Sequence, residues 1–422
     1  MVATSGADDD ARPPGSLVHP CTICRVNEDD DGESDEGGIC ANCGGLCCSK
    51  CALRLMREHD FMQDCPACGV PFVDNDRDTV VALEKLLDKK AGRHTPMAQC
   101  ALAKHYYDGT GCDKDVKAAY HLIKAAATQG FPLAHFQMGL LHDAAGATAV
   151  AEMSFHNAAN KGYARAQIHL GKRCESAGNR EEAKKWFTLA AEKGVVEGQR
   201  EVANLHMYDK EYKLAKKWYT KAAEKGDTLA QLGLGLVLRF DDDVRRRDYK
   251  AATWLRRAAE KGEPVSQVEL GNCYYEGRGV KQDFVTAMRW FRLSANQNNG
   301  AAMRCIGLCY RDGMGVSKKD IKECLRWWRK AASHNDGEAA RLLGNAYYEG
   351  GQERGVKRDM VQAFMWFERG AQLEDTPAQS MLGCMYKLGQ GVQQDRAMCV
   401  KYLRLAANEG YPPAQVRGSS SF

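Results

Sequence analysis

Hydrophobic residues recur with helical spacing through most of the chain after residue 77. Within 78–92, Val80, Leu83 and Leu87 fall on one face of a helix, and a glycine follows its basic last turn. This pattern predicts a helix, inside a connecting segment 76–96, that caps the helices after it. By contrast, residues 1–18 are polar and rich in Gly, Pro and Asp, which is typical of a disordered tail.

From Met97 onward the sequence repeats itself with steps of 32 to 39 residues. A marker position holds tryptophan in most units, and alanine always follows it five residues later. Glycine usually follows the marker after eight residues, and glycine or alanine follows after seventeen. A period of this length accommodates two short helices. The marker residues are Leu122, Ser154, Trp186, Trp218, Trp254, Trp290, Trp327, Trp366 and Tyr402.

These recurring residues have physical roles in a helical hairpin. We expect the tryptophan and its aromatic neighbour to fill the gap between adjacent hairpins, and the small residues to let helix backbones approach closely. The glycine eight residues after the marker ends the second helix in the left-handed conformation. Asn298 and Asn335 tolerate that conformation at the same position, whereas Glu374 does so poorly. Residues 245–247, three arginines, fall in a predicted turn between two helices.

A Gly-x-Gly-Val sequence separates the two helices of several units, at 277–280, 313–316 and 389–392, with an expanded version at 350–356. Over 97–418, about nine units, the chain therefore resembles the Sel-one-like repeat, a relative of the tetratricopeptide repeat. The resemblance implies an all-α fold, a right-handed superhelical solenoid of helix-hairpin repeats. Such a solenoid serves as a scaffold that binds other proteins.

Two units carry matching polar residues on their first helices. Arg200 and Asn204, and likewise Arg341 and Asn345, lie four residues apart and so share one helix face. In tetratricopeptide-type arrays that face lines the concave groove, where such residues grip a carboxylate. The resemblance therefore predicts that an acidic or C-terminal carboxylate segment of a partner protein lies in the groove. The alternative is that these are ordinary solvated groove residues.

Nine of the 18 cysteines lie between residues 21 and 68, and eight of them form four Cys-x-x-Cys pairs. Zinc takes four thiolates in tetrahedral geometry, so eight cysteines fit two structural zinc ions. A segment this short builds little hydrophobic core, and metal binding would supply its folding free energy. The pairs are Cys21 with Cys24, Cys40 with Cys43, Cys48 with Cys51, and Cys65 with Cys68.

The spacing of the four pairs resembles the RING-type zinc finger, here over residues 19–75. The resemblance implies one zinc site of Cys21, Cys24, Cys48 and Cys51, and a second of Cys40, Cys43, Cys65 and Cys68. It also implies that Ile23 and Pro66 contact a ubiquitin-conjugating enzyme. Gly69 stands where active ligases often carry a basic residue, and Cys47 is interpreted as a bystander.

The stretch 40–51 also resembles the FYVE zinc finger, which binds phosphatidylinositol 3-phosphate through a basic strand. Here the corresponding residues are acidic to neutral, and the insert 28–36 is acidic, so repulsion of an anionic lipid argues against membrane binding. No apolar run reaches the roughly 18 residues needed to cross a bilayer. The N-terminus lacks the pattern of a secretory signal. We therefore expect a soluble cytoplasmic or nuclear protein, in which reduced thiols are available for zinc.

Composition and motifs exclude several further classes of function. The net charge is only +4, so nothing indicates a nucleic-acid partner. Neither a catalytic triad nor a phosphate-binding loop nor a dinucleotide fingerprint appears, so we expect no small-molecule substrate. The leading hypothesis is a scaffold whose repeats select one protein and whose zinc module recruits another. The alternative is a RING-type ubiquitin ligase without covalent catalytic residues of its own, whose repeats select the substrate. A FYVE-like lipid reader is disfavoured.

Overall fold

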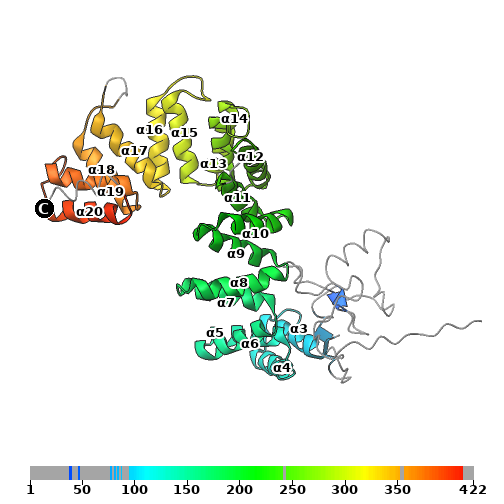
Figure 1. Ribbon diagram of the computed structural model, residues 1–422. Coiled ribbons are helices and arrows are strands. Elements are labelled where there is room, and N and C mark those ends of the chain that lie inside the picture. The colour runs from blue at the N-terminus through cyan, green and yellow to red at the C-terminus, as the bar shows by residue number, and fades with distance from the viewer. Residues whose placement is uncertain are drawn as a thin grey trace, which may run out of the picture. The chain divides into compact units, whose positions relative to one another are not determined.

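The computed structural model describes residues 38–39, 46–47, 77, 80–81, 83–84, 87, 95–240, 244–351 and 356–411. Two short strands, β1 (Gly38–Ile39) and β2 (Leu46–Cys47), pair antiparallel. The long described helices, from α3 to α20, form nine hairpins in chain order (Figure 1). The chain divides into two compact units, 1–222 and 223–422, and each is described by itself.

The helices of the first unit are α3 (Thr95–Asp108), α4 (Val116–Thr128), α5 (Pro132–Ala144), α6 (Thr148–Asn160), α7 (Ala164–Ser176), α8 (Arg180–Glu192), α9 (Val196–Tyr208) and α10 (Tyr212–Glu224), which ends just past the unit boundary. Those of the second unit are α11 (Thr228–Val237), the 3-10 helix η1 (Leu238–Phe240), α12 (Val244–Glu260), α13 (Pro264–Glu276), α14 (Phe284–Ala295), α15 (Gly300–Asp312), α16 (Ile321–Ser333), α17 (Gly337–Glu349), α18 (Met360–Gln372), α19 (Thr376–Leu388) and α20 (Arg396–Asn408).

Within each unit the hairpins stack in sequence order, because each second helix contacts the next first helix. A buried glutamine reinforces several of these contacts. In the second unit, Gln267 of α13 donates from Nε2 to the carbonyl oxygen of Ala259 in α12, at 3.2 Å. That carbonyl lies in the last turn of α12 and also accepts from the N–H of Gly262 at 3.0 Å, so two donors satisfy it. The chain thus folds as an all-α solenoid of helical-hairpin repeats.

In several hairpins a first-helix glycine lies close against a ring on the second helix. A Cβ added to Gly271 of α13 would lie 2.5 Å from Cε1 of Phe291 in α14. The ring, rather than the helix backbone, therefore fills the space that glycine leaves. The marker tryptophan lies between hairpins as predicted: Trp290 packs against a hydrophobic cluster formed by α12 of the preceding hairpin and α13 of its own. Its neighbour Phe291 packs on Gly271 of its own hairpin and belongs to a buried cluster that continues into α15 of the next hairpin.

The turn after each second helix confirms the prediction of a left-handed residue. Gly262 has φ +93°, and the two asparagines at this position, Asn298 and Asn335, have φ +64° and +62°. Glu374 is held in the same region, at φ +61°, although its Cβ makes that conformation costly. The structure adds a residue that the repeat pattern did not reveal: Lys210, between α9 and α10, has φ +62°.

The Gly-x-Gly-Val turns attach each hairpin to the one before it. A Cβ on Gly279 would collide with the carbonyl oxygen of Asp248 in α12, and one on Gly315 would collide with that of Phe284 in α14. Both glycines also have positive φ. Two independent constraints, backbone conformation and close approach, therefore require glycine at these positions.

The interpretation of residues 245–247 as a turn is wrong, because they lie in the first turns of α12. Arginine is a good helix former, so the helix extends further toward the N-terminus than the repeat spacing suggested.

Described residues just before α3 bear on the predicted capping helix. Residues 77, 80–81, 83–84 and 87 are helical, and the buried side chains of Val80 and Leu83 pack against Ala98 and Leu102 of α3. The rest of 78–92 lies outside the described residues. The division of the chain at 18, 75 and 96 stays a prediction.

Candidate functional site

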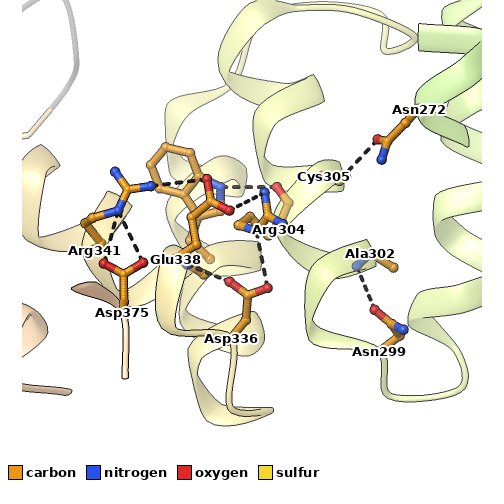
Figure 2. Close-up of polar contacts among 11 residues, drawn as sticks. Asn272, Asn299, Ala302, Arg304, Cys305, Asp336, Glu338, Arg341 and Asp375 are labelled. Carbon is orange, nitrogen blue, oxygen red and sulfur yellow. Dashed lines mark hydrogen bonds and ion pairs between the residues drawn. The ribbon is translucent and has the colours of Figure 1, made fainter. Parts of the chain in front are cut away.

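Arginines on successive first helices of the second unit are joined by carboxylates from neighbouring hairpins. Glu338 contacts two arginines. Its Oε2 lies 3.0 Å from Nη1 of Arg304 in α15, and its Oε1 lies 3.1 Å from Nη2 of Arg341 in α17. Arg304 also pairs with Asp336, and Arg341 with Asp375. Figure 2 shows Glu338 between the two guanidinium groups. We call these five residues the charge ladder.

Helix capping places the two aspartates of the ladder. Asp336 is the N-cap of α17 and accepts from the backbone N–H of Ala339 through Oδ1, at 2.6 Å. Its Oδ2 accepts from Nε of Arg304 at 3.2 Å. Asp375 is the N-cap of α19 in the next hairpin and is arranged in the same way, with Arg341 as its partner. Each cap residue therefore serves two structural purposes, helix initiation and an ion pair to the preceding first helix.

The members of the ladder differ in how firmly they are held. The side chains of Asp336 and Asp375 are 9% and 11% exposed, whereas that of Glu338 is 45% exposed. Burial works against the charged form of Arg304, but the carboxylates of Asp336 and Glu338 raise its pKa, so the guanidinium stays charged. Burial raises the pKa of Asp375, although Arg341 opposes that shift. Glu338 is thus the most exposed member of the ladder.

The matching site in the first unit, predicted from Arg200 and Asn204, is also occupied by the chain's own groups. Nη2 of Arg200 lies 2.9 Å from Oε1 of Glu201, and Nδ2 of Asn204 donates to Oε2 of that carboxylate at 2.9 Å. Oδ1 of Asn204 accepts from the hydroxyl of Tyr219 at 2.6 Å. One glutamate therefore joins the two predicted residues, and a partner carboxylate would have to compete with it.

The sequence pattern identified part of the charge ladder. It singled out Arg341 with Asn345, and the structure places both on α17, half-buried. It missed Arg304, although this arginine precedes Gly307 by three residues, as Arg341 precedes Gly344. The repeat register could have revealed Arg304. It could not have revealed Glu338, because nothing in the register shows that its carboxylate reaches two helices. Binding of a partner carboxylate at these positions stays a prediction.

The predicted zinc ligands Cys21, Cys24, Cys40, Cys43, Cys48, Cys51, Cys65 and Cys68, and the predicted enzyme contacts Ile23 and Pro66, lie outside the described residues. The described strands β1 and β2 flank the Cys40–Cys43 segment, and Cys47 pairs with Gly38 in their register. Where the structure describes the chain, no group of His, Cys, Asp and Glu could hold a metal ion. Among the same residues, no helix is both long and apolar enough to cross a membrane.

Two of the solved structures that resemble this fold are Sel1-type or SLR-type proteins. A Sel1 repeat protein from Oxalobacter formigenes is 30% identical over 72% of this chain and 91% of its own, with a TM-score of 0.57. A protective antigen of uropathogenic Escherichia coli, which displays an SLR fold, is 27% identical over 81% of this chain and 82% of its own, also with a TM-score of 0.57. Comparison with curated proteins found no match.

Comparison with protein-family models matches most of the chain after residue 95 to one family, the Sel1 repeat. Residues 132–163, between the first two matched segments, form the hairpin α5–α6, in which Gly139 meets Phe155 as Gly271 meets Phe291. The matched segments are 96–131, 164–195, 197–227, 228–263, 264–299, 300–336, 337–375 and 376–411. With these eight repeats and the stacked hairpins that they form, the chain belongs to the Sel1 repeat family.

Proposed function

We propose that this chain is a protein-interaction scaffold that binds a carboxylate-bearing segment of a partner at the charge ladder. Proteins of the Sel1 repeat family act as protein-interaction scaffolds. The observation that supports this site is the position of Glu338, which bridges Arg304 and Arg341 while remaining 45% exposed. When Glu338 turns toward solvent, a partner carboxylate takes its place between two guanidinium groups. Arginine favours such contacts because its planar fork can form two parallel hydrogen bonds.

A peptide-binding measurement on the full chain tests this site. The probe is a fluorescein-labelled acidic peptide with a free C-terminal carboxylate, and its amidated, charge-neutral counterpart is the control. Arg341→Ala should weaken binding by about tenfold, the loss of one charge-assisted contact. Glu338→Gln should strengthen binding, because it removes the competing charge. Arg326→Ala, at a side chain that is 79% exposed on α16, is the matched control. Affinity that is the same for both peptides, or indifferent to Arg341→Ala, would contradict the proposal.

We also propose that residues 19–75 bind two structural zinc ions. Support comes from the donor set, eight thiols in four Cys-x-x-Cys pairs, and from the antiparallel pairing of β1 with β2 on either side of Cys40 and Cys43. Zinc there would stabilise a segment with too little apolar core to fold alone. Metal analysis of the full chain under reducing conditions should give two zinc ions per chain. Cys48→Ser should lower that number and Cys47→Ser should not; the opposite result would reassign the ligand.

A second candidate function is that of a RING-type ubiquitin ligase whose repeats select the substrate. The Cys-Thr-Ile-Cys and Cys-Pro-Ala-Cys pairs, which include Ile23 and Pro66, favour it. In such a ligase the zinc ions are structural, and the chain positions a conjugating enzyme that carries ubiquitin. An autoubiquitination assay across a panel of conjugating enzymes tests this function. Ile23→Ala should abolish activity while the zinc content stays at two; activity that survives this change would refute the assigned contact.

A further inference from the structure

The second unit has an open surface cavity of about 1040 Å³ at the ends of its hairpins. It is bounded by α12, by the turn between α13 and α14, by the first residues of α14, and by the turn between α15 and α16. We call it the turn cavity. The Gly-x-Gly-Val turns form two of its walls, and their close backbone contacts with the preceding hairpins, described above for Gly279 and Gly315, hold these walls in place.

Six of the thirteen residues that line the turn cavity are aromatic or aliphatic. Tyr249, Tyr274 and Phe284 contribute rings, and Val280, Val285 and Val316 contribute branched aliphatic side chains. Tyr249 is 66% exposed and Val285 is 54% exposed. Leaving apolar surface of this kind in water costs free energy, which a partner's apolar side chain would recover by covering it.

The turn cavity also carries positive charge that the described chain leaves uncompensated. Its cations are Arg256 and Lys281, and its single carboxylate is Asp283. Asp283 is committed to capping α14, because Oδ1 accepts from the N–H groups of Val285 and Thr286 and Oδ2 accepts from the Thr286 hydroxyl. Nη2 of Arg256 donates to the neutral hydroxyl of Tyr274 at 2.9 Å. Within the described residues neither cation pairs with a carboxylate, in contrast to both arginines of the charge ladder.

Charge and shape together select one class of occupant. An apolar side chain matches the rings of the lining, and carboxylates on either side of it match Arg256 and Lys281. A nucleic-acid strand would need rows of cations along its phosphates rather than two cations around an apolar floor. An acidic peptide with an apolar anchor satisfies both requirements.

We infer that the turn cavity is a docking site for a short acidic segment of a partner protein, which inserts one aromatic or large aliphatic side chain and pairs its flanking carboxylates with Arg256 and Lys281. The inference rests on the chain being a scaffold, but it does not depend on the charge ladder. The two sites take different ligands. The ladder binds a carboxylate in exchange for Glu338, whereas the turn cavity binds an apolar anchor together with its charges.

The test measures fluorescence anisotropy of labelled peptides on the full chain. The probe is a peptide with three glutamates on each side of a Phe-Leu pair and an amidated C-terminus. One control peptide replaces Phe-Leu by Ala-Ala, a second replaces the glutamates by lysines, and an oligothymidine of similar length represents nucleic acid. The variants are Lys281→Glu, Tyr249→Ala, and the double variant of Arg256→Glu with Lys281→Glu. Lys185→Glu on α8, at a side chain that is 72% exposed, is the matched control.

We expect the Phe-Leu peptide to bind best. The double charge reversal should weaken it at least about tenfold, Tyr249→Ala should weaken it about threefold or more, and Lys185→Glu should leave it unchanged. Equal binding of the Ala-Ala peptide would show attraction by charge alone and would overturn the inference, as would tighter binding of the oligothymidine. Loss of binding in Arg341→Ala but not in the cavity variants would overturn the cavity site and leave the proposed scaffold function standing. Circular dichroism of each variant confirms that it is folded.

Discussion

The ring of Phe291 lies directly over Gly271, so close that a Cβ at that position would approach within 2.5 Å of Cε1. Phe291 is fully enclosed and cannot move aside without disturbing the core between α13 and α14. Gly271→Ala should therefore lower the free energy of unfolding by about 1–3 kcal/mol, the usual cost of overpacking a core. Urea denaturation followed by circular dichroism measures the change. Arg326→Ala is the surface control, and an effect as small as the control's would contradict this account.

Glu374 adopts a conformation that its side chain disfavours, with φ +61° at an exposed position. Glu374→Gly should stabilise the second unit by about 1 kcal/mol, because glycine removes the steric cost of the left-handed region. Asn298→Gly, at the equivalent position two repeats earlier, is the matched control and should change little, since asparagine already tolerates that region. The two melting temperatures decide: a gain for both variants, or for neither, would show that backbone strain at Glu374 is not the cause.

The buried cysteines of the second unit should be chemically inert in the folded protein. Burial raises the pKa of Cys305 to about 11 and those of Cys309 and Cys324 to about 12. At pH 8 the thiolate, which is the reactive form, is therefore scarce at all three positions. Iodoacetamide followed by peptide mass spectrometry should label these cysteines only after unfolding in urea. Rapid alkylation of the native chain would mean that α15 and α16 open frequently.

Asp283 should make the stability of the second unit depend on pH in the acid range. The hydroxyl and backbone N–H of Thr286 hold the pKa of Asp283 below its ordinary value. A carboxyl whose pKa is lowered by folding stabilises the fold above its unfolded pKa of about 3.9, and that contribution is lost as pH falls through the lower, folded pKa. The difference in melting temperature between the native chain and Asp283→Asn should therefore be largest near neutral pH and shrink in acid. A difference that does not vary with pH would exclude this contribution.

The parts of the structure that could be predicted from sequence are those set by local geometry. The left-handed residues after the second helices, such as Gly262 and Asn298, follow from one repeating position, because the sign of φ depends on a residue and its immediate neighbours. The repeat period likewise determines two helices per unit and their stacking, since one hairpin cannot bury its own apolar face. The two zinc ions expected from four Cys-x-x-Cys pairs stay a prediction, because those cysteines lie outside the described residues.

Only the tertiary structure decided which side chains meet across hairpins. Arg304 of α15 pairs with Asp336 and Glu338 of the next hairpin, and Arg341 of α17 pairs with Asp375 of the hairpin after that. The repeat pattern is silent on such pairings because the partners lie about one repeat apart and their contact depends on how one hairpin rotates onto the next. The turn cavity likewise combines the end of one hairpin with two turns of its neighbours. A carboxylate must come within a few ångströms of a cation to neutralise it, and the sequence does not show that distance. Arg341 is paired with carboxylates in the fold. Lys281 has no such carboxylate partner among the described residues.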